Sequence, residues 1–218
     1  MNSKILWLPS YRGLNEMINR KHNIKTRIKE DDNYRLIFFT GTSLEENMFD
    51  ELLSVFIEGK PEPRKIFDEI KKHYQRVVKG LSPDDDELLT HINDYLVEID
   101  WLLEDGPQDS EEKIRDIMQT IQLLMGSRIA TSLLKLDDWS WVDARDLFWV
   151  EEDYHRTGPS DEKVKSDLRN LVTEKKSILP VITQGNLVGT DDNNSLFIDL
   201  EDPMKKAAKE LDIDFVEL

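Results

Sequence analysis

The chain has 218 residues, of which 45 are Asp or Glu and 29 are Lys or Arg, so its formal net charge is −16. A charge of this sign repels phosphate backbones and anionic bilayers, and we therefore expect neither nucleic acid nor membrane as a partner. Cysteine is absent, which excludes disulfides, thiolate zinc sites and cysteine nucleophiles.

The remaining composition is typical of a folded protein. Hydrophobic residues make up 39% of the sequence, and no apolar run approaches the length of a membrane span. The first apolar run, Ile5 to Leu8, ends at Pro9 and is too short for the core of a signal peptide. We expect a cytoplasmic protein in which residues 1–218 form a single domain.

The amino-terminal part of the sequence predicts a β-α-β unit. Ile5 to Leu8 favours a short buried strand, and the aromatic and branched run Tyr34 to Thr40 favours a buried strand of a parallel sheet. The basic stretch between them, Arg20 to Lys29, has apolar residues at helical spacing. A helix there would return the chain to the second strand.

Long helices are predicted for the middle of the chain. Apolar residues recur at three- and four-residue spacing between Leu88 and Leu103, and again between Ile114 and Leu133. Gly106 and Pro107 interrupt the pattern between the two runs, so the second helix should run back antiparallel to the first. Two further helical patterns precede them, at Met48–Phe56 and Ile66–Val78.

The start of the helix around Leu88–Leu103 carries a recognisable signal. Ser82 is the expected N-cap, Pro83 the first helical residue, and Asp84 to Asp86 fill the first turn. The helix dipole accounts for the three aspartates, which we expect to be solvated.

Strands return after residue 136. The expected strands are Trp139–Val142, Leu147–Val150, Ile178–Thr183, Leu196–Ile198 and Phe215–Leu218. The expected connections are a polar turn at Arg156–Pro159, a helix near Glu162–Val172 and a helix opened by Asp202 and Pro203. Alternation of strand and helix at both ends indicates an α/β fold with a mostly parallel central sheet and an inserted antiparallel helical layer.

Short signatures of common enzyme chemistry are absent from the sequence. It contains no GxSxG, HExxH, GxGxxG or GxxxxGK[ST], and its four histidines are scattered. We therefore expect no catalytic residue of these classes, no metal site and no cofactor. The acids Glu151 to Asp153 follow an expected strand at the carboxyl edge of the sheet, where a magnesium role stays open beside a structural one.

Four segments resemble the kinase domain of aspartokinases, which are members of the amino acid kinase family. RLIFFTGTS (residues 35–43) is similar to the second strand of that family and its turn, and MGSRIATSLL (125–134) is similar to the helix with the FGERLS motif. SWVDARDLFWVEEDYHR (140–156) is similar to the strand and DAR turn, and LPVITQGNLVGTDD (179–192) to the strand before the nucleotide loop. The resemblance implies a three-layer amino acid kinase-like fold.

Departures from the family fall on the residues that would transfer the phosphoryl group. Trp7 stands where the KFGGTS phosphate loop has its lysine, and Ser127 stands where FGE has its glutamate. FIDLED (residues 197–202) stands in place of LGRGGSD, which removes an arginine and two glycines and adds carboxylates near the phosphates. We also expect the chain to lack the carboxyl-terminal part of the nucleotide-binding lobe and the ACT domains. These losses imply that ATP does not bind.

The resemblance leaves four weak candidates for binding an amino acid ligand, namely Thr40, Arg128, Asp143 and Arg145. Each also has a structural interpretation. Thr40 can simply end a strand, Arg128 can pair with a carboxylate of the sheet, and the DAR turn can hold its own residues.

Three functions stay open on the sequence alone. The first is a non-catalytic regulatory or interaction protein, in which the scaffold keeps a surface for a homodimer or a protein partner. The second is a small-molecule sensor that binds an amino acid, and the third is an aspartate kinase with displaced catalytic residues. An exposed apolar patch would favour the first, and a concave site with an unpaired arginine would favour the second.

Overall fold

The computed structural model describes residues 3–8, 14–40, 46–60, 62–107, 110–143, 150–152, 155–157, 160–181 and 201–217. Its centre is a five-stranded sheet in the order β3-β6-β2-β1-β7, and every neighbouring pair of strands is parallel. The strands are β1 (Lys4–Leu8), β2 (Tyr34–Thr40), β3 (Trp139–Trp141), β6 (Lys176–Val181) and β7 (Asp214–Glu217).

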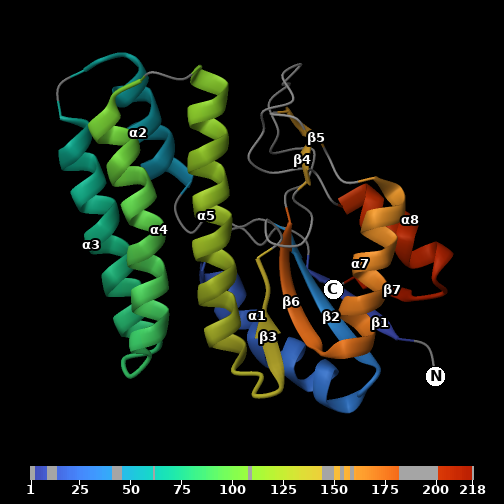
Figure 1. Cartoon of the computed structure of the whole chain (residues 1–218). Helices are drawn as coiled ribbons and strands as arrows, with labels where there is room; N and C mark the ends of the chain where they lie inside the picture. Colours follow the sequence, from blue (N-terminus) through green and yellow to red (C-terminus); the bar gives the residue numbers. More distant parts are fainter. Residues whose placement is uncertain are drawn as a thin grey trace.

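Helices cover both faces of this sheet, as Figure 1 shows. One face packs against α1 (Leu14–Glu30) and α5 (Glu111–Leu134), and the other packs against α7 (Asp161–Glu174) and α8 (Glu201–Glu210). This arrangement confirms the three-layer α/β fold. None of the helices in the described part of the chain is both long enough and apolar enough to cross a membrane.

A further helical layer lies beyond α5, on its side away from the sheet (Figure 1). It consists of α2 (Glu46–Ile57), α3 (Pro63–Leu81) and α4 (Asp86–Asp105), which pack with α5 as a bundle. Helices α4 and α5 run antiparallel, so the inserted antiparallel layer expected from the sequence is confirmed.

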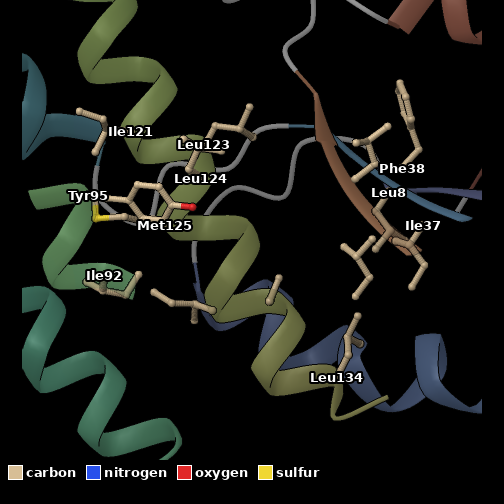
Figure 2. Packing of buried hydrophobic residues seen from close by; sticks show 14 of the residues in the cluster. Leu8, Ile37, Phe38, Ile92, Tyr95, Ile121, Leu123, Leu124, Met125 and Leu134 are labelled. Atoms are coloured by element: carbon tan, nitrogen blue, oxygen red, sulfur yellow. The ribbon is translucent and has the colours of Figure 1, made fainter. Parts of the chain in front are cut away.

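Helix α5 belongs to the sheet and to the bundle at once. Eight consecutive residues, 120–127, are buried, which requires neighbours on every side of the helix. Figure 2 shows Ile92 and Tyr95 of α4 on one side of α5 and Leu8 and Phe38 of the sheet on the other. The core is therefore continuous through α5 from the bundle to the sheet.

Burial of the central strands follows from their two helical covers. Ile5, Leu6 and Leu8 of β1 are each 0% exposed, although neighbouring residues of a strand point to opposite faces. A continuous apolar run, unlike an alternating one, marks a strand that is covered on both faces. The same reasoning predicted β2 correctly.

The predicted start of α4 is wrong by three residues. Ser82 ends α3 and bonds through its hydroxyl to the Ser132 hydroxyl at 2.9 Å. Asp85 is the N-cap, because its carboxylate accepts from the Leu88 amide at 2.9 Å. It also accepts from Ser132 and is half-buried, so of the three aspartates only Asp84 and Asp86 are exposed.

The expected polar turn at Arg156–Pro159 is also wrong. Strands β4 (Val150–Glu152) and β5 (His155–Thr157) pair antiparallel in a separate small sheet. Hydrogen bonds between backbone groups hold such a hairpin together, and they do not depend on which side chains it has. Its sequence therefore need not show the apolar alternation from which a strand is predicted. Helix α8 begins at Glu201, which puts Asp202 inside its first turn. The expected strand Leu196–Ile198 lies outside the described residues.

Candidate functional site

The carboxyl ends of the parallel strands meet at one edge of the sheet, which is where ligands bind in open α/β folds. The segments that follow β1, β2, β3 and β6 there begin at residues 9, 41, 144 and 182 and lie outside the described residues. Arg145 is therefore among the undescribed residues. The backbone of Thr40 forms the end of β2 and is in register with Val181 of β6.

Trp7 lies at this edge, one residue before the end of β1. Its ring packs against Phe215 of β7 with centroids 6.3 Å apart, and the Lys205 ammonium of α8 lies 3.7 Å from the centre of the Trp7 ring. The indole Nε1 is buried and has no hydrogen-bond partner among the described residues. The ring thus fills the space between the end of β1 and α8.

This contact has a defined electrostatic character. The face of an indole ring is negative and attracts a cation, with an energy of about 0.5–2 kcal/mol that depends on exposure. Trp7 itself has no positive charge to offer a ligand, but it holds the Lys205 ammonium beside β1. No pattern in the sequence indicates this pair, because 198 positions separate Trp7 from Lys205.

Arg128 is stacked on a second tryptophan. Its guanidinium carbon lies 3.6 Å from the centre of the Trp141 ring, which joins α5 to the end of β3. The Trp141 indole donates to the Ser127 hydroxyl at 3.0 Å, and that hydroxyl donates to the Leu124 carbonyl at 2.8 Å. The stack and these two bonds fix the arginine side chain against the sheet.

One atom of Arg128 stands out in this arrangement. Its Nε is buried and has no hydrogen-bond partner among the described residues. Most buried polar groups are satisfied, so a guanidinium N–H left over in this way is a candidate donor to a ligand. Asp143, half-buried, lies two residues after Trp141, just beyond the end of β3.

The structure brings Arg128 and Asp143 to neighbouring elements but separates them from Thr40. Strand β6 lies between β3 and β2, so the backbones of those two strands are about 10 Å apart, twice the ordinary strand spacing. Ser127, interpreted as a lost catalytic position, is fully buried and holds Trp141 in place.

The opposite, amino edge of the sheet holds an acidic hollow of about 470 Å³, lined by Ser3, Glu30, Asp31, Asp32, Asn33 and Arg35. Lys4 hydrogen-bonds Asp31 at 2.7 Å, which lowers the pKa of that carboxyl and raises the pKa of the Lys4 ammonium. No group of three or more potential metal ligands occurs among the described residues, in this hollow or elsewhere.

Comparison with known proteins gives matches in structure alone, since the sequence matches no family model and no curated protein. Escherichia coli aspartokinase III in complex with aspartate and ADP is 16% identical, with a TM-score of 0.62 over 97% of this chain and 49% of that one. The same enzyme with lysine and aspartate gives a TM-score of 0.63 at 16% identity, over 96% and 48% of the two chains.

The aspartate kinase of Clostridium acetobutylicum is 18% identical and has a TM-score of 0.55, over 86% of this chain and 42% of that one. The chain thus spans about half the length of the structures it matches. At identities of 16–18%, these matches show a shared fold. This is the fold implied by the resemblance of the four sequence segments. The chain therefore has the aspartokinase fold over about half the length of those enzymes.

Proposed function

We propose that this protein is a non-catalytic aspartokinase-like protein that acts in regulation or interaction. The observation that carries this proposal is Trp7. A neutral indole, packed between Phe215 and Lys205, occupies the end of β1 where the resemblance implies a lysine for the transferred phosphoryl group. An indole cannot stabilise the negative charge that develops in that transition state.

Helix α8 adds a second argument against nucleotide binding. Helix N-termini attract phosphates, but acids in the first turn already satisfy the positive end of the dipole, and α8 has Glu201 and Asp202 there. At an effective dielectric near 20, each carboxylate within about 4 Å of a phosphate charge would oppose binding by about 4 kcal/mol before screening.

Isothermal titration with Mg-ATP, together with an assay of aspartate-dependent ADP release, tests the proposal. We expect no heat of binding and no release of ADP above the background. A dissociation constant in the low micromolar range, or ADP release that requires aspartate, would show that the protein is a kinase. In that case Lys205→Ala, compared with the exposed Lys209→Ala on the same helix, would show whether Lys205 acts as a displaced catalytic cation.

Binding of an amino acid is the second candidate function, and the Nε of Arg128 is the observation that favours it. A guanidinium is well suited to a carboxylate ligand. A thermal-shift panel of amino acids tests this function, because a ligand raises stability by RT ln(1 + [L]/Kd). We expect a positive shift to disappear in Arg128→Ala and to persist in the control Arg169→Ala, an exposed arginine of α7.

A further inference from the structure

Helix α4 has an unusual charge pattern. Seven of its 20 residues are acidic, and none is Lys or Arg. Its inner side packs into the bundle through five buried residues, Leu88, Ile92, Tyr95, Leu96 and Ile99. In Figure 1 this helix lies on the far side of α5 from the sheet, remote from the carboxyl edge. Its outer side therefore takes no part in the site described above.

Two large hydrophobic residues are exposed on this outer side. Trp101 is 62% exposed and Val97 is 37% exposed, and in the described part of the chain no other large hydrophobic residue is as open to solvent. They are four residues apart, so they lie on the same face of the helix, one turn from each other. A tryptophan presents a large apolar area that gains free energy when a partner covers it.

Carboxylates surround this apolar pair. Asp94, Glu98 and Asp105 lie seven residues before, three residues before and four residues after Trp101, which puts all three on its face of the helix. We call Asp94, Val97, Glu98, Trp101 and Asp105 together the α4 face.

Two further carboxylates of the helix bind an arginine of α3. Arg64 of α3 binds Asp100 and Glu104, the second at 3.2 Å, and Glu104 lies three residues after Trp101, at the border of the α4 face. Arg64 therefore compensates part of the negative charge on this side of α4, and with seven acidic residues and no Lys or Arg of its own the helix stays acidic.

The α4 face combines an apolar centre with an acidic rim, and this combination determines the partner. We propose that the α4 face docks a basic, amphipathic helical segment of another protein. Apolar side chains of that segment would cover Trp101 and Val97, and its Lys or Arg residues would pair with the carboxylates and stack on the indole. This inference names the partner for the interaction role proposed above and rests on that role.

A second copy of this chain fits the face less well. Two copies repel one another because each has a formal net charge of −16. The negative potential of the protein attracts a basic segment and raises its rate of association. The two helices richest in basic residues among those described, α1 and α3, bury their apolar sides, for example at Ile24 and Ile70, in the protein's own core. Neither helix can present an apolar side to another copy.

Titration of a fluorescently labelled peptide with the full chain tests the proposal. The peptide is an amphipathic helix of about 18 residues, or five turns, built from Leu, Lys and Arg. A matched peptide has Glu in place of every Lys and Arg. Fluorescence anisotropy measures the binding of both to the unaltered chain and to three variants. These are Trp101→Ala, Asp94→Lys and the charge-reversal control Glu51→Lys, which lies on an exposed position of α2.

We expect the basic peptide to bind, the acidic peptide not to bind, and Trp101→Ala to weaken binding at least tenfold. Asp94→Lys should weaken it several-fold, and Glu51→Lys should leave it unchanged. Equal weakening by Asp94→Lys and Glu51→Lys, with no effect of Trp101→Ala, would overturn the proposal in favour of unspecific attraction between opposite charges. Absence of peptide binding, or sedimentation of the chain as a dimer that Trp101→Ala dissociates, would also overturn it. Neither result depends on whether Mg-ATP binds, so the two proposals fail separately.

Discussion

At the scale of single residues, the two tryptophan–cation contacts define the site more than any carboxylate or histidine does. Trp7 holds Lys205, and Trp141 holds Arg128, each within 4 Å of the ring centre. Both rings are planar supports that hold a flexible charged side chain in one position. The hydrogen bond from Trp141 to Ser127 is what orients the second ring.

Ser127→Ala should destabilise the protein by about 1–2 kcal/mol, because the Trp141 indole would lose its acceptor while staying partly buried. Thermal unfolding followed by circular dichroism measures the change. Ser54→Ala is the control, since the Ser54 hydroxyl bonds only to the exposed Glu58 carboxylate among the contacts described. Equal losses in the two variants would contradict the role given to Ser127.

At the scale of elements, the cap at Asp85 joins three helices. Its carboxylate accepts from the Leu88 amide and from the Ser132 hydroxyl, and Ser132 also contacts Ser82 at the end of α3. The residues 82–85 thus tie the start of α4 to the last turns of α5.

Asp85→Ala should lower the free energy of unfolding by about 0.5–2 kcal/mol, the usual range for an N-cap. Asp84→Ala, one residue earlier and exposed, should change it far less. Urea unfolding curves of the two variants and of the unaltered chain measure both changes in the free energy of unfolding. A larger loss in Asp84→Ala than in Asp85→Ala would contradict the capping role given to Asp85.

The pair of Asp31 and Lys4 joins the turn before β2 to the start of β1 and predicts a pH dependence. The pKa of the Asp31 carboxyl is lowered in the folded protein, chiefly by the hydrogen bond from Lys4. Its stabilising contribution is therefore complete above the unfolded pKa of about 3.9 and is lost as the pH falls through the folded value. Asp31→Asn should destabilise the protein at neutral pH, and its difference from the unaltered chain should shrink toward acid in unfolding curves recorded across that range.

The elements themselves were largely predictable from the sequence, for reasons that particular residues make clear. A short apolar run rich in aromatic and branched residues, such as Leu36–Phe38, favours a strand covered on both faces, and the spacing between Leu88 and Leu103 favours a helix. Caps and hairpins were not predictable in the same way. Ser82 and Asp85 are both good N-caps, and the choice depends on where α3 ends: Ser82 is the C-cap of that helix, and Asp85 accepts from the Leu88 amide.

The site was less accessible to sequence reasoning than the fold. Resemblance pointed to Arg128 and to the altered position Trp7, but the cation that each tryptophan binds depends on how α8 and α5 pack against the sheet. Periodicity says which side of a helix is buried and nothing about the register between two helices or between a helix and a strand. Lys205 was missed for that reason.

At the scale of the whole molecule, we expect α5 to join the bundle and the sheet into one cooperative unit. Leu124 of α5 is 0% exposed and belongs to the core shared by both layers (Figure 2). Leu124→Ala should therefore destabilise the protein by about 2–5 kcal/mol.

The loss of stability in Leu124→Ala should affect both layers together. Far-ultraviolet circular dichroism reports mainly on the helices. The fluorescence of Trp7, Trp139 and Trp141 reports on the sheet when Trp101 of α4 and Trp149 are replaced by Phe in both chains compared. The two unfolding transitions should coincide in the unaltered chain and in the variant. Separate midpoints for the two signals would mean that the bundle and the sheet are independent domains.

The order of the strands also determines when the sheet can be completed during synthesis. Strand β1 pairs on one side with β2, about 30 residues later along the chain. On its other side it pairs with residues 214–217. The other edge of β2 stays unpaired until β6 has been synthesised, because Leu36 pairs with Ser177. Parallel pairings between such distant segments form slowly, since a long loop must close before any contact is gained. A nascent chain of this protein therefore carries two apolar strands with open edges while the whole helical layer is being made, and this interval is when a chaperone would protect it from aggregation.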